Sequence, residues 1–157
     1  MRISRENPGW KVELVDGDIQ MTPPAGFRGS RHNSRITALL DAWGEQHNYA
    51  VTDSSGGYKL PGGSVLSPDA GLVLSERLAN LTSEQQDEFC TLVPDVVIEL
   101  ASPSDSRATL RRKCERWHRE GVGYVVLLDP DREPESWGQA PRDFLSLASF
   151  VEAIGSN

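Results

Sequence analysis

One stretch of the chain decides its fold: residues 96–128, which read VVIELASPSDSRATLRRKCERWHREGVGYVVLL. Two apolar runs, Val96–Leu100 and Tyr124–Leu128, are typical of strands that are covered on both faces. Between them, apolar residues at helical spacing predict a helix over Ser104–Glu120, which Gly121 ends. A strand, a helix and a second strand in this order form a βαβ unit, so the two strands are expected to be parallel neighbours.

The flanking sequence extends this unit to an α/β fold with a mixed central sheet. Asp16-Gly17 between two apolar runs indicates an N-terminal hairpin, because such turn residues accept positive φ. Helical spacing predicts a helix over Arg31–Gln46, with Ser30 as its cap, and a closing helix over Phe144–Ile154. Three more strands are expected over Tyr49–Thr52, Tyr58–Leu60 and Ala70–Leu74. A loop is expected over Ser75–Val93, with a helical turn near Ser83–Glu88, and an irregular tail over Asp129–Trp137.

Length and composition limit the classes of protein to which the chain can belong. With 157 residues, the whole chain (1–157) is expected to form a single domain. No apolar run approaches the roughly 20 residues of a membrane-spanning helix, and the two cysteines form no disulfide framework, so we expect a cytoplasmic protein. The net charge of -7 argues against a protein that coats nucleic acid, but less against an enzyme whose bound cations offset acidity.

Glu99 breaks the pattern of its strand. An ionised carboxylate inside an apolar strand is costly unless it is paired or binds a metal. The alternative is that the strand lies at an edge of the sheet and Glu99 points to water. Alternation places Asp95 on the same face of the strand as Glu99.

Lys113 breaks the pattern of its helix in the same way. It lies three residues after Leu110 and four before Trp117, on the apolar stripe. The alternative is that only its stem is buried and its ammonium group reaches water. A third candidate, Asp69, begins the strand Ala70–Leu74, where an ordinary turn residue is the alternative.

Together these three residues suit metal-dependent cleavage of phosphodiester bonds. Two carboxylates near strand ends can bind Mg²⁺, or Mn²⁺, which keeps several water ligands of its own. The metal lowers the pKa of a bound water and polarises the phosphoryl group, while a neighbouring lysine orients the water or stabilises charge. Asp69 and Glu99 are therefore the expected metal ligands, and Lys113 is the expected third catalytic residue.

Several stretches resemble the Uma-type restriction endonucleases, which belong to the PD-(D/E)XK restriction-endonuclease-like nucleases. The matching stretches are VELVDGDI (12–19), LSPD (66–69), PDVVIELASPSD (94–105), Lys113, Gly121-Val122 and Leu128-Asp129-Pro130. The resemblance implies a restriction-endonuclease-like core, with a mixed central sheet flanked by helices, and activity on nucleic acid, most simply DNA.

The resemblance also implies roles for single residues. Asp69 and Glu99 match the two acidic ligands. The lysine that usually follows the glutamate by two residues is replaced by Ala101, and Lys113 matches the lysine that the Uma-type pattern takes from the next helix. His32 matches a position that is often histidine, although a helix-start or core histidine is an equal alternative. After Asp129-Pro130 the family usually carries a longer strand hairpin, which the shorter segment here is expected to lack.

Further residues are candidates for accessory roles. His32 and Asp95 are candidate accessory site residues, and Arg31, Arg35 and Arg111 are candidate phosphate contacts. A homodimer is expected because cleavage of a duplex benefits from two sites. Two rival functions stay open: a catalytically idle relative that binds nucleic acid or protein, and a sugar hydrolase that uses two carboxylates.

Overall fold

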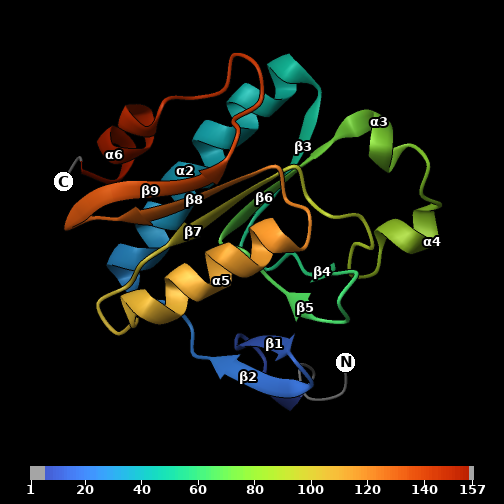
Figure 1. Ribbon diagram of the computed structural model, residues 1–157, viewed down its shortest axis with the longest axis horizontal. Helices are drawn as coiled ribbons and strands as arrows, with labels where there is room; N and C mark the ends of the chain where they lie inside the picture. Colours follow the sequence, from blue (N-terminus) through green and yellow to red (C-terminus); the bar gives the residue numbers. More distant parts are fainter. Residues whose placement is uncertain (1–5, 156–157) are drawn as a thin grey trace.

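The computed structural model describes residues 6–155, and its centre is a mixed five-stranded sheet with the order β3-β6-β7-β8-β9 (Figure 1). The five strands are β3 (Tyr49–Thr52), β6 (Ala70–Leu74), β7 (Val96–Leu100), β8 (Tyr124–Asp129) and β9 (Arg132–Gly138). Strands β7 and β8 are parallel, and every other neighbouring pair is antiparallel. The predicted α/β fold and the parallel pair at its centre are confirmed.

Helices cover both faces of this sheet (Figure 1). On one face, α2 (Phe27–His47) and α6 (Leu147–Gly155) pack on alternate strand residues such as Val96 and Ile98. On the other face, α5 (Arg107–Arg119) packs through Cys114 and Trp117 on the intervening residue Val97. The continuous apolar sequence of β7 is explained by this double cover. No helix within residues 6–155 is long and apolar enough to cross a membrane.

A smaller sheet lies beside α5 and has the order β2-β1-β5-β4. Its members are β1 (Lys11–Val15), β2 (Asp18–Thr22), β4 (Tyr58–Lys59) and β5 (Val65–Leu66). The hairpin β1–β2 turns at Asp16 and Gly17, both with positive φ, as predicted. An ion pair between Asp16 and Arg116 joins the hairpin to α5.

The C-terminal part of the sheet corrects the sequence analysis. The tail predicted to be irregular over Asp129–Trp137 contains β9, which pairs with β8 along its length. The segment after Asp129-Pro130 thus forms a strand that makes a hairpin with β8. Pro134 is tolerated because β9 is an edge strand, where one missing amide donor costs little.

Helix boundaries also differ from those predicted. Helix α2 begins at Phe27, after Gly26, so Ser30 lies inside the helix and is not its cap. Helix α5 begins at Arg107, capped by Ser106, and α6 begins at Leu147. The helical turn predicted near Ser83–Glu88 is present as α4 (Ser83–Gln86), and a second short helix that was not predicted, α3 (Ser75–Leu78), precedes it.

Candidate active site

Glu99 is a buried carboxylate at the centre of the molecule. It is the fourth residue of β7, which lies between β6 and β8, and it is 1% exposed. The edge-strand alternative is therefore wrong. Its Oε1 accepts a hydrogen bond from Trp117 Nε1 at 2.7 Å. Burial raises the pKa of Glu99 to about 7, although the nearby charge of Lys113 lowers it.

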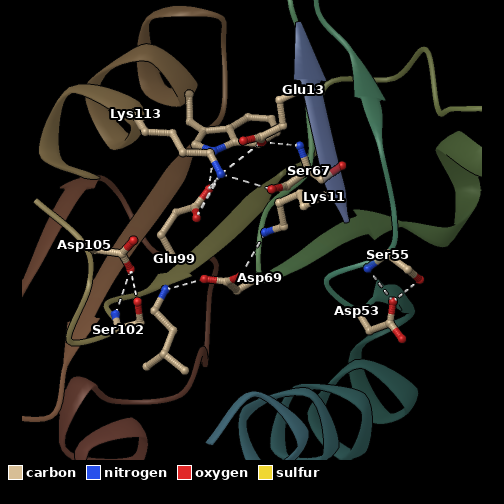
Figure 2. A network of polar contacts seen from close by, with 12 residues as sticks. Lys11, Glu13, Asp53, Ser55, Ser67, Asp69, Glu99, Ser102, Asp105 and Lys113 are labelled. Atoms are coloured by element: carbon tan, nitrogen blue, oxygen red, sulfur yellow. Dashed lines mark hydrogen bonds and ion pairs between the residues drawn. The ribbon is translucent and has the colours of Figure 1, made fainter. Parts of the chain in front are cut away.

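Lys113 supplies the charge that compensates Glu99. Its Nζ lies 3.0 Å from Glu99 Oε1 and 3.0 Å from Glu13 Oε1, and it donates to the carbonyl oxygen of Ser67 at 3.1 Å. The ammonium group thus points into the site and does not reach out to water (Figure 2). Burial alone would lower the pKa of Lys113, but the carboxylates of Glu99, Glu13 and Asp69 raise it above its ordinary value.

Asp69 lies at the start of β6, next to the end of β7. Its Oδ2 accepts a hydrogen bond from the backbone amide of Leu100 at 2.7 Å, and its Oδ1 lies 3.0 Å from Lys11 Nζ. The charge of Asp69 contributes to the raised pKa of Glu99, so the two carboxylates interact electrostatically. Antiparallel pairing of β6 with β7 produces this proximity, since the start of one strand meets the end of the other.

Two site residues come from β1 and were missed by the sequence analysis. Glu13 is 6% exposed, accepts a hydrogen bond from the Ser67 amide at 2.8 Å and contacts Lys113. Lys11, two residues earlier, contacts Asp69. The site therefore contains three carboxylates and two ammonium groups, and its formal charge is one negative when all five are ionised (Figure 2).

The other predicted residues lie apart from this cluster. His32 is buried on α2, across the sheet from α5, and burial together with Arg28, Arg31 and Arg35 lowers its pKa. Asp95 precedes β7 at the end opposite to Leu100, where it binds Arg77 and the Leu74 amide. Neither residue contacts Glu99. The central sheet separates His32 from Glu99, and the length of β7 separates Asp95 from it.

The predicted phosphate contacts are engaged within the fold or distant from the site. Arg35 donates to the Ala153 carbonyl of α6 at 3.2 Å. Arg111 forms an ion pair with Glu135 of β9 at 2.9 Å. Arg31 lies on α2, the helix that covers the face of the sheet opposite to α5. The structure therefore assigns no arginine of the three to the cluster around Glu99.

The donor atoms of the cluster suit a hard divalent cation by their chemistry. Carboxylate and carbonyl oxygens are the ligands that Mg²⁺ and Mn²⁺ prefer, and Asp69 and Glu99 supply two carboxylates. Each carboxylate is, however, already paired with an ammonium group. Within residues 6–155, no three His, Cys, Asp or Glu side chains are grouped so that they could hold a metal ion. Asp69 and Glu99 would fit a cation that keeps several water ligands, and such a cation would have to displace an ammonium contact.

Comparison with known proteins agrees with this architecture. The model of the Uma2 family, described as "Putative restriction endonuclease", matches residues 1–150. A solved structure, a "putative nuclease belonging to DUF820" from Anabaena variabilis, superposes with a TM-score of 0.71 at 17% sequence identity. The superposition covers 91% of this chain and 90% of that chain, and it shows a shared fold. No curated protein matches the chain significantly.

Proposed function

The chain belongs to the Uma2 family, and from this premise we propose that it is a divalent-metal-dependent nuclease that hydrolyses phosphodiester bonds in DNA. One observation carries the proposal: a charged lysine and a carboxylate, Lys113 and Glu99, are buried together at the end of β7 beside Asp69. Buried ion pairs seldom stabilise a fold more than apolar residues of the same size would. Their presence at a strand end thus favours a chemical role.

In this proposal Asp69 and Glu99 hold Mg²⁺ or Mn²⁺. When bound, the cation supplies charge to the phosphoryl oxygens and lowers the pKa of a water. Lys113 acts as a fixed positive charge, because its carboxylate neighbours keep its pKa above the ordinary value. An ammonium group in this state orients a water or stabilises negative charge on the phosphate, and it does not serve as a base.

Glu13 and Trp117 act as positioning residues. Trp117 donates to Glu99 Oε1, and Glu13 binds both Lys113 and the Ser67 amide. These contacts fix Glu99 and Lys113 from two directions, so neither side chain has to be ordered when substrate binds.

The test compares Lys113→Met with Lys59→Met in a cleavage assay with Mg²⁺ or Mn²⁺ on single-stranded, double-stranded and branched DNA. Loss of the fixed charge should lower the rate by roughly 10²-fold or more. Lys59 is a matched control because its side chain is 48% exposed and its ammonium group forms an ion pair with Glu88 at 3.6 Å, away from the cluster. Thermal melting of each variant checks that it is folded.

Comparison of Glu99→Gln with Lys113→Met separates metal binding from cleavage of the phosphodiester bond. This variant should lose metal affinity and cleavage together, whereas Lys113→Met should keep its metal, since Asp69 and Glu99 remain. Cleavage at the wild-type rate by Lys113→Met would remove the lysine from the mechanism.

A second candidate function is binding of nucleic acid or protein without catalysis. The paired state of both carboxylates and the net charge of -7 favour it. Absence of metal-dependent cleavage by the wild type over all three substrates would decide for this candidate.

We further propose that two copies of the chain associate through the hairpin. All five residues of β2 are exposed, including Ile19 and Met21, which are 46% and 39% exposed. Apolar side chains on an unpaired edge strand favour pairing with a second chain. A dimer would present two sites to the two strands of a duplex.

A further inference from the structure

Lys11 enters the cluster from a separate sheet and forms an ion pair with Asp69. It belongs to β1, whereas Asp69 begins β6 of the central sheet. Its Nζ lies 3.0 Å from Asp69 Oδ1, and the two side chains are 20% and 22% exposed. This pair is therefore the most accessible of the three ion pairs that the cluster contains among the described residues, since the side chains of Glu13 and Glu99 are 8% and 2% exposed.

We propose that Lys11 is a built-in cation that occupies Asp69 in the metal-free protein and competes with the divalent cation for it. This inference rests on the proposed function, in which Asp69 is a metal ligand. Lys11 is then a positioning residue that acts through Asp69, and its charge sets the metal concentration at which the site fills.

The contacts of Asp69 show which of its oxygens is open to exchange. Its Oδ2 is held at 2.7 Å by the backbone amide of Leu100, at the end of a central strand. Its Oδ1 is held by the lysine ammonium at the end of a flexible four-carbon stem. A cation can thus replace Lys11 at Oδ1 without breaking a backbone contact.

The second lysine of the site is held far more firmly. Lys113 contacts Glu99, Glu13 and the Ser67 carbonyl oxygen, whereas within residues 6–155 the ammonium group of Lys11 contacts Asp69 alone. Displacement of Lys113 would break several charge-assisted contacts, and displacement of Lys11 would break one. Lys11 is consequently the ammonium group that a metal would displace first.

A purely structural role would make Lys11 a tether that joins the hairpin to the central sheet. Other contacts also join the hairpin to the rest of the fold: the ion pair of Asp16 with Arg116, the hydrogen bond from the Ser67 amide to Glu13, and the ion pair of Glu13 with Lys113. Arg116 therefore provides a matched control, since Arg116→Met removes a tether of the same kind without changing a contact of Asp69.

The experiment is calorimetric titration of the full chain with Mn²⁺, for the wild type, Lys11→Met, Lys11→Arg and Arg116→Met. Loss of one positive charge beside Asp69 should tighten Mn²⁺ binding roughly tenfold in Lys11→Met, the scale of one screened charge contact at this distance. Lys11→Arg keeps the charge and should bind within about threefold of the wild type, on the same scale. Arg116→Met should bind as the wild type does.

The outcomes separate this inference from the proposed function. If the wild type binds Mn²⁺ and Lys11→Met binds it equally or more weakly, the inference is overturned and the proposed function stays intact. If Lys11→Met and Arg116→Met weaken Mn²⁺ binding by similar amounts, Lys11 is a tether, and this result also overturns the inference. Absence of Mn²⁺ binding by every variant overturns the proposed function, and the inference with it.

Discussion

Glu99 is a carboxylate whose protonation depends on its surroundings. Burial raises its pKa from the ordinary 4.5 to about 7, and the charge of Asp69 adds to this rise. The folded protein therefore takes up a proton at Glu99 more readily than the unfolded chain does. Between these two pKa values the unfolded state binds fewer protons at this residue, so the contribution of Glu99 to stability falls as pH rises.

The first prediction at this scale concerns Glu99→Gln in the metal-free protein. The wild type loses stability when Glu99 ionises. The amide of the variant stays neutral at every pH, so the variant does not lose stability in this way. The melting temperature of the variant, relative to that of the wild type, should rise as pH increases from 4.5 to about 7. Thermal melts at several pH values measure this difference, and a difference that does not change with pH would contradict the prediction.

The sequence singles out some residues of the charge cluster and not others, for one physical reason. Glu99 and Lys113 are charged residues at positions whose neighbours are apolar, so they stand out. Lys11 and Glu13 alternate with Val12 and Leu14 in a hairpin strand, where the polar face normally meets water. Only the packing of the small sheet against α5 turns that face towards the site.

At the scale of helices and strands, the central unit was predictable and the edge was not. Strands β7 and β8 have continuous apolar sequences, because both of their faces are covered. Strand β9 reads REPESWG and is half-exposed along its length, so its sequence resembles a loop. Its position comes from backbone pairing with β8 and from contacts of two side chains with distant residues. Glu135 pairs with Arg107 and Arg111 of α5, and Trp137 packs against the core, and neither contact follows from a local sequence pattern.

The second prediction concerns Gly138, the last residue of β9. It has a φ of +81°, and a Cβ there would lie 2.0 Å from the carbonyl oxygen of Gly123. Gly138→Ala should therefore lower the free energy of unfolding by about 2–4 kcal/mol, through backbone strain and displacement of the Gly123 segment. Urea denaturation measures this change.

Gly17 is the matched control for Gly138. Its φ is +88°, but a Cβ there would meet nothing within 4 Å. Gly17→Ala should cost only the strain of a positive φ, about 1 kcal/mol. Equal losses in the two variants would show that the close approach to Gly123 has no energetic effect.

For the whole molecule, the third prediction is the mass in solution. A dimer should have twice the mass of the 17.3 kDa chain. Replacement of Ile19 and Met21 by lysine should yield the monomer, because like charges on paired edge strands repel. Static light scattering measures both masses, and a wild type that stays monomeric at high micromolar concentration would contradict the dimer.

The participation of the N-terminal hairpin in the site has a consequence for the order of folding. Lys11 lies 58 residues from Asp69 along the chain, Glu13 lies 54 residues from Ser67, and Asp16 lies 100 residues from Arg116. Contacts of such sequence separation form late, because closing the intervening loop costs entropy before the contact is gained. A nascent chain that has emerged only as far as β6 thus carries Asp69 but neither Glu99 nor Lys113. During synthesis, the complete charge cluster is expected to assemble only after α5 has left the ribosome.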